Sequence, residues 1–186
     1  MRHESDIAPE FSVTVALDDL PDEGARYALC ADEAARAGLA ARFGLVSLDR
    51  LEAEVSLSWV RRDEVLSLSG RLSADVVQNC VVTLEPVRST VEEEIDLCFA
   101  RDIDSAAEVV DPDSAEPLDS DILDIGEVVA EELSLALDPY PRAPGVDPKA
   151  LRLGPGATYL TEEEAGSGEQ PGNRPFEVLA GLRPKH

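Results

Sequence analysis

Bulky apolar residues alternate with small or polar ones along most of the first hundred positions. The alternation covers residues 11–17, 51–59, 65–76 and 87–99, and a period of two is typical of a strand with one buried and one solvated face. The polar turn at 61–64 joins the second and third of these segments, which predicts an antiparallel hairpin. The fourth segment extends the hairpin into an antiparallel meander.

The apolar phase of the 65–76 strand continues beyond its end, through Cys80, Val82 and Leu84 to Pro86. Because proline has no backbone N–H, Pro86 is expected to mark a turn, a bulge or a strand edge. The polar side of the strand that follows is largely acidic, and such a row is expected to discourage edge-to-edge pairing of sheets.

A first helix is predicted over residues 22–43. Pro21 and the acidic residues after it suit a helix N-terminus, and Gly44 suits the left-handed position that ends a helix. Cys30 is expected beside the apolar stripe of this helix, as a packing residue and not as a reactive thiol. The stripe consists of Ala28, Ala31, Ala35 and Leu39.

A second helix is predicted over residues 125–137. Asp124 and Glu127 have the spacing of a capping box, and Pro139 is expected to end the helix. Its stripe consists of Ile125, Val128, Val129, Leu133, Ala136 and Leu137. The expected fold is therefore α+β, an antiparallel β-meander covered on one face by two principal helices.

One domain is expected over residues 1–141, and a Pro/Gly-rich tail over residues 142–186 that ends in a short apolar and basic segment. Within the domain, residues 102–120 are acidic, contain two prolines and show no sustained period. This segment is expected to form a flexible excursion.

Acidic residues dominate the charge of the chain. There are 39 Asp and Glu against 16 Lys and Arg, which gives a formal net charge of -23. Such a surface repels the phosphate backbone of nucleic acids and attracts basic polypeptides, although solubility alone is an alternative reason for it. Aromatic residues make up only 4% of the chain, which argues against a base-stacking platform.

Enzymatic chemistry finds little support in the residue pattern. The two histidines are His3 and His186, both near the termini, and the three cysteines form no CxxC pair. We therefore expect a non-enzymatic protein with no cofactor and no metal site. The first residues lack the apolar run of a signal peptide, and no segment is apolar enough to span a membrane, so a cytoplasmic location is expected.

Arg61 and Arg62 are the one local group of positive charge in the predicted sheet. They are candidates for contact with RNA phosphates. The alternative is a solvated turn in which the two arginines pair with Asp63 and Glu64.

The segment 65–99 resembles the central motif of the YceD family, the large ribosomal RNA subunit accumulation proteins, also called domain of unknown function 177. The motif is a strand with a glycine, an apolar strand that ends in a cysteine motif and Leu-Glu-Pro, and then an acidic strand. Here the matching residues are Gly70, Cys80 and Leu84-Glu85-Pro86.

Two further segments support the resemblance. Residues 123–141 are similar to the second family hallmark, an acidic-capped helix that closes in Leu, Pro and Tyr, and the final PFEVLAGL is similar to endings of alphaproteobacterial members. Many members carry a second cysteine where this chain has Thr83, which argues against a zinc or redox role for Cys80.

The resemblance implies a role in accumulation or processing of 23S ribosomal RNA and in assembly of the large subunit. The preferred partner is a basic large-subunit ribosomal protein or a pre-ribosomal particle, held by the acidic face and a binding motif. Direct binding of 23S rRNA is the alternative, and a metal-dependent RNA-processing enzyme is the less favoured one. The motif residues are Cys80, Thr83, Leu84, Glu85 and Pro86.

Overall fold

The structure is a computed structural model that describes residues 9–61, 64–102 and 115–146. These residues belong to one compact unit that extends to Val146. In chain order its elements are β1 (Thr14–Ala16), η1, a 3-10 helix (Leu17–Asp19), β2 (Ala25–Cys30), α1 (Glu33–Phe43), β3 (Ser47–Arg61), β4 (Val65–Asn79), β5 (Pro86–Ala100), β6 (Ala115–Pro117), β7 (Ile122–Asp124) and α3 (Ile125–Ala136).

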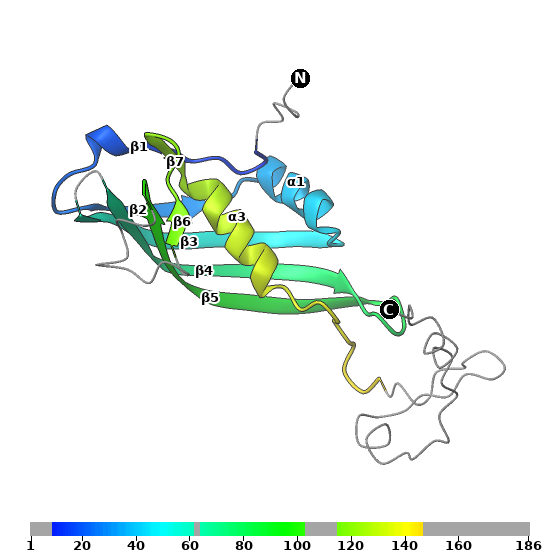
Figure 1. The fold of residues 1–186 in the computed structure, drawn as a ribbon. Coiled ribbons are helices and arrows are strands. Elements are labelled where there is room, and N and C mark those ends of the chain that lie inside the picture. Colours follow the sequence, from blue (N-terminus) through cyan, green and yellow to red (C-terminus); the bar gives the residue numbers. More distant parts are fainter. Residues whose placement is uncertain (1–8, 62–63, 103–114, 147–186) are drawn as a thin grey trace, which may run out of the picture. The chain divides into compact units, whose positions relative to one another are not determined.

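Five strands form one sheet in the order β2-β3-β4-β5-β6, and β1 pairs with β7 in a separate two-stranded sheet (Figure 1). The neighbours from β2 to β5 are antiparallel, whereas β6 runs parallel to β5. The predicted meander corresponds to β3, β4 and β5, and the predicted α+β class is confirmed.

One face of the sheet carries the apolar core. Leu29, Ala53 and Leu72 lie opposite one another on β2, β3 and β4 and are all buried. Helix α1 packs against β3, and α3 packs against β4 and β5, on this same face (Figure 1). Leu39 and Leu133 supply fully buried side chains from the two helices.

The opposite face of the sheet, here called the open face, carries only exposed or half-buried side chains. Serines and charged residues dominate it. Its residues are Arg26, Ala28 and Cys30 on β2, Glu52, Glu54, Ser56 and Ser58 on β3, Ser67, Ser69, Arg71, Ser73 and Asp75 on β4, and Thr90, Glu92, Glu94, Asp96 and Cys98 on β5.

The first predicted helix is wrong in its N-terminal half. Residues Ala25–Cys30 form strand β2, and α1 begins only at Glu33, where the Asp32 carboxylate accepts the N–H of Ala35 at 2.8 Å. Cys30 is an exposed residue of β2 and does not pack beside a helix. The predicted end at Gly44 is confirmed, with φ of 66°.

The first predicted strand is shorter than expected. Only Thr14–Ala16 are paired, with β7, although Phe11, Val15 and Leu17 are buried as the alternation requires. The chain enters a 3-10 helix at Leu17.

Part of the predicted acidic excursion is ordered in the sheet. Ala115–Pro117 form β6 beside the end of β5, and Leu118 is buried. The prediction of a flexible segment is therefore wrong for these residues, while residues 103–114 lie outside the described ranges, as does the predicted tail beyond residue 146.

Helix α3 begins as predicted and ends one residue early, at Ala136. The Asp124 carboxylate accepts the N–H groups of Gly126 and Glu127 at 3.0 and 3.2 Å, so the N-cap is confirmed. The Glu127 carboxylate pairs with Arg42 of α1 at 2.6 Å and thereby links the two helices.

Candidate functional site

The connection between β4 and β5, residues 80–85, forms a turn centred on a buried cysteine, here called the Cys80 turn. The Cys80 Sγ accepts the N–H of Val82 at 3.4 Å, of Thr83 at 3.4 Å and of Ala143 at 3.3 Å. Three backbone N–H groups therefore surround the Cys80 sulfur. Neither the residues of the turn nor their apolar alternation predicts this arrangement.

These donors change the acidity of the thiol. The pKa of Cys80 is lowered to about 7, first by the hydrogen bond from the Thr83 side chain and then by the bond from the Ala143 N–H. Hydrogen bonds to the charged form favour that form. The fully buried Cys80 sulfur therefore acts as a hydrogen-bond acceptor within the turn.

Backbone hydrogen bonds hold the Cys80 turn against the segment that follows α3. The Val81 N–H donates to the Pro141 carbonyl at 2.9 Å, and the Gln78 side-chain amide donates to the Asp138 carbonyl at 3.0 Å. Inside the turn, the Leu84 N–H donates to the Cys80 carbonyl at 2.9 Å. The two family hallmarks described from the sequence are therefore in direct contact.

Leu84 has an unusual backbone conformation and an exposed side chain. Its φ is 62°, in the left-handed region that leucine rarely adopts, and its side chain is 75% exposed. A residue of this kind costs conformational energy that surrounding contacts must offset, and such strain clusters at functional positions. Val81 and Tyr140 are exposed as well, so the turn presents an apolar tip.

The structure brings the predicted motif residues together only in part. Thr83 and Glu85 lie beside Cys80, because the Thr83 hydroxyl oxygen accepts the Glu85 N–H at 3.4 Å and the Cys80 N–H donates to the Glu85 carbonyl at 2.8 Å. The expectation that Leu84 continues the buried face of the strand is wrong, because β4 ends at Asn79. Pro86 is the first residue of β5.

The open face contains a hollow that the sequence reasoning did not find. It measures about 790 Å³ and is lined by residues of β2, β3, β4 and β5. Five glutamates line it, Glu52 and Glu54 from β3 and Glu92, Glu93 and Glu94 from β5, together with Arg71 of β4. An adjoining hollow of about 520 Å³ shares Glu54, Arg71 and Glu94 with it.

Charge in this hollow is mostly uncompensated. Arg71 lies 3.9 Å from the Glu54 carboxylate, and both side chains are 77% exposed. The only other arginine that pairs with a lining glutamate in the described ranges is Arg50, which contacts Glu52 at 3.2 Å and also binds Asp75. In the sequence, the only sign of this hollow is that acidic residues and serines alternate with the core residues. Which of these residues lie side by side depends on the strand register.

The structure does not support the predicted contact of Arg61 with RNA phosphates. Arg61, at the end of β3, bonds the Glu64 carboxylate at 2.9 Å and is half-buried. This is the local ion pair expected as the alternative to an RNA contact. Arg62 lies outside the described residues.

Two further kinds of feature are absent from the described ranges. Residues 9–61, 64–102 and 115–146 contain no group of three or more His, Cys, Asp or Glu side chains placed to hold a metal ion. No helix in that part of the chain is long and apolar enough to cross a membrane.

Comparison with known families supplies the decisive observation. The family described as large ribosomal RNA subunit accumulation protein YceD matches residues 68–183, which is more than half of the chain. The chain belongs to the YceD family. The matched region contains the Cys80 turn, β5, β6, α3 and the segment that follows α3.

The family description places the chain in accumulation of the large ribosomal subunit RNA. No curated protein and no solved structure matches the chain.

Proposed function

We propose that this YceD-family protein promotes accumulation of 23S rRNA by binding, without turnover, a basic large-subunit ribosomal protein or an assembly intermediate that exposes one. The observation that supports this most is the hollow on the open face. Five glutamates and one arginine line it, no helix of the described chain covers it, and its charge complements a Lys/Arg-rich surface.

The geometry of the open face suits recognition of a polypeptide. Glu52 and Glu54 are two residues apart on β3, which separates them by about 6.8 Å along the strand. Lysines spaced i and i+2 in an extended segment, or i and i+4 in a helix at about 6 Å, match that interval. Electrostatic complementarity of this type speeds association and selects the partner, and it weakens as salt is added.

The Cys80 turn is proposed as a second contact. Leu84 is an exposed apolar residue on a rigidly held turn, so it loses little conformational freedom when it enters an apolar pocket of a partner. An apolar anchor beside a charged face is a common arrangement in protein interfaces.

Direct contact with 23S rRNA is the remaining alternative for binding. It would rely on Arg61 and its neighbour in sequence, but the Arg61 guanidinium is already paired with Glu64. The acidic open face also opposes approach of a phosphate backbone. The protein-binding function therefore has more support than the RNA-binding one.

Affinity capture of the tagged full-length protein from a bacterial lysate tests the proposal. At low salt, with RNase added, we expect one basic large-subunit protein to be enriched, and at high salt we expect it to be lost. Recovery of 23S precursor RNA that persists after ribosomal proteins are stripped would overturn the proposal in favour of RNA binding. Cleavage of precursor RNA by the pure protein with magnesium or manganese would instead show that the protein is a metal-dependent RNA-processing enzyme.

Paired variants locate the contact. Glu52→Gln with Glu54→Gln removes two charges from the open face, whereas Asp18→Asn with Glu23→Gln removes two exposed charges elsewhere. We expect about tenfold weaker capture for the first pair and less than twofold change for the second. Equal effects of both pairs would show that net charge, and not the open face, attracts the partner.

A further inference from the structure

Strand β5 has a long outer edge. It pairs with β4 from Pro86 to Ala100, without a break in register, but on its other side β6 covers only Cys98–Ala100. Within the described ranges no strand lies beside residues 86–97 on that side. β5 therefore presents a row of backbone donors and acceptors that could take another strand.

The register identifies which backbone groups point outward. The Leu118 N–H donates to the Ala100 carbonyl at 2.8 Å on the β6 side. The Glu85 carbonyl instead accepts the Cys80 N–H at 2.8 Å on the β4 side. Because strand groups alternate with a period of two, the even-numbered residues direct their N–H and C=O outward. Along the uncovered stretch these residues are Pro86, Arg88, Thr90, Glu92, Glu94 and Asp96, and from Thr90 onward none of them is basic.

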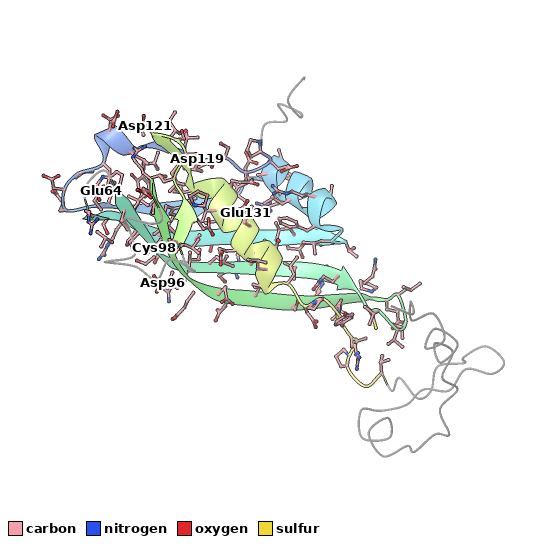
Figure 2. The ribbon with its side chains drawn as sticks, in the orientation of Figure 1. Glu64, Asp96, Cys98, Asp119, Asp121 and Glu131 are labelled. Atoms are coloured by element: carbon pink, nitrogen blue, oxygen red, sulfur yellow. The ribbon has the colours of Figure 1, made fainter. Side chains whose placement is uncertain are left out.

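Carboxylates flank this edge on both faces of the sheet. Glu92, Glu94 and Asp96 stand on the open face, and Figure 2 shows Asp96 there and Glu131 on α3, on the helix side. On the helix side, burial and the carboxylates of Glu116, Glu93 and Glu131 raise the pKa of Glu132. The acids are crowded at this edge, and a cation placed among them would relieve their repulsion.

The odd-numbered positions of the edge are partly apolar. Val91, Ile95 and Leu97 lie on the helix side of β5, where Ile95 is buried and the other two are half-buried. A strand added at this edge would meet acids on the open face and a mixture of apolar and acidic groups on the other. An alternation of Lys or Arg with apolar residues fits both.

The charge of the edge also selects against other occupants. A second copy of β5, paired antiparallel about Glu93, would place Glu92 opposite Glu94, which is unfavourable for directly opposed residues. The segment 103–114, which connects β5 to β6, contains four acidic residues and no Lys or Arg, so it does not supply the cations either.

We propose that residues 90–97 of β5 are a docking edge for a Lys/Arg-rich extended segment of a protein partner, which adds to the sheet as a new strand in line with β6. This inference rests on the proposed function, since it specifies how the basic partner is recognised. Main-chain hydrogen bonds supply affinity in this mode of binding, and alternate side chains supply specificity.

The test uses the full chain and a synthetic ten-residue peptide of alternating lysine and valine. Glu92→Ala and Glu92→Pro both remove the carboxylate, but only proline removes the outward N–H and blocks pairing. Proline is tolerated where a strand N–H faces solvent, and no hydrogen bond to β4 is lost. Circular dichroism checks that each variant is folded.

Fluorescence anisotropy should show peptide binding about two- to fivefold weaker for Glu92→Ala, and at least a further tenfold weaker for Glu92→Pro. The same peptide with alternate residues N-methylated keeps its charge but cannot pair along a strand, and we expect no binding by it to the unaltered protein. This second measurement also decides the question if Glu92→Pro fails to fold.

The outcomes separate this inference from the proposed function. Equal binding by Glu92→Ala and Glu92→Pro, or by the plain and methylated peptides, would overturn strand addition and leave capture of a basic protein by the open face intact. No peptide binding at all, with capture of a basic protein preserved, would also overturn it. Loss of capture from the lysate itself would instead refute the proposed function.

Discussion

The sheet from β2 to β5 presents two surfaces that are built from alternate residues of the same strands. On the helix-covered face, Leu68 is fully buried, whereas its neighbour Ser69 is exposed on the open face. The first surface excludes water by packing against α1 and α3. The second keeps serines, arginines and glutamates in solvent and contains the hollow of about 790 Å³.

This difference separates the residues that determine stability from those available for recognition. Apolar burial stabilises by about 25 cal/mol per Å² and is concentrated on one face. Exposed ion pairs contribute little, so acidic residues on the other face do little for the fold and are free to serve a partner. Substitutions on the two faces should therefore have effects of different size and kind.

The largest contrast is expected between neighbouring residues of β4. Leu68→Ala should lower the free energy of unfolding by about 2–5 kcal/mol, because it leaves a cavity under the helices. Ser69→Ala should change it by less than about 0.5 kcal/mol. Urea denaturation followed by circular dichroism measures both, and similar losses at the two positions would contradict the division between the faces.

A smaller loss is expected at Gly70, where β3 and β4 approach each other closely. A Cβ at this position would overlap the backbone carbonyl of Glu54. Gly70→Ala should therefore destabilise the protein by about 1–3 kcal/mol, since backbone must move to make room. The same urea titration tests this, with Ser69→Ala as control, and an unchanged midpoint would show that the strands can separate without cost.

The ion pair between Arg50 and Asp75 on the open face should contribute still less to the free energy of unfolding. Asp75 accepts hydrogen bonds from Arg50 at 2.8 Å and from Thr90 at 2.8 Å, and the first of these is the main reason that its pKa is lowered. A lowered pKa stabilises the fold at neutral pH, and this contribution is lost as the pH falls through the folded-state pKa, below the ordinary value of 3.8.

We therefore expect Asp75→Asn to lower the Tm slightly at pH 7, and we expect the difference from the unaltered protein to shrink towards pH 3. Thermal melts across that range provide the measurement. A difference that grows on acidification would have the wrong sign for this ion pair.

A pH-dependent effect is expected at Cys80, the buried residue that follows β4. Its folded-state pKa of about 7 lies below the ordinary 9.0, so its thiolate stabilises the folded chain increasingly as the pH rises from about 7 to 9. The Tm advantage of the unaltered protein over Cys80→Ala should grow over that interval.

Cys98 provides the matched control for this prediction. Burial, and then Asp96, raise its pKa, so Cys98→Ala should show no such growth between pH 7 and 9. Identical pH dependence for both variants would mean that the donors around the Cys80 sulfur do not act on a thiolate.

Much of the sheet could be predicted because alternation is a local property. Residues 51–59 and 65–76 show it without interruption, and the structure pairs them as β3 and β4. The error at β2 has a physical cause, since its short alanine-containing sequence suits a helix as well as a strand. Pairing such as Ala25 with Leu57 decides between them, and that partner lies 32 positions away.

The residues of the Cys80 turn could be singled out from the sequence, but their geometry could not. Family resemblance pointed to Cys80 and the Leu-Glu-Pro that follows, yet the N–H of Ala143 reaches the sulfur from 63 residues further along the chain. The hollow of the open face could not be predicted at all, because the glutamates of β3 and β5 converge only through the strand between them.

By itself the sequence determined the charge of the surface, the alternating strands, the capped helix α3 and the family, because each of these depends on composition or on residues close together in the chain. The tertiary structure alone decided that residues 25–30 join the sheet, that Leu84 leaves the buried face, and that the outer edge of β5 lies among carboxylates from α3 and β6. These features depend on strand register and on contacts between distant segments, which only the packed core selects.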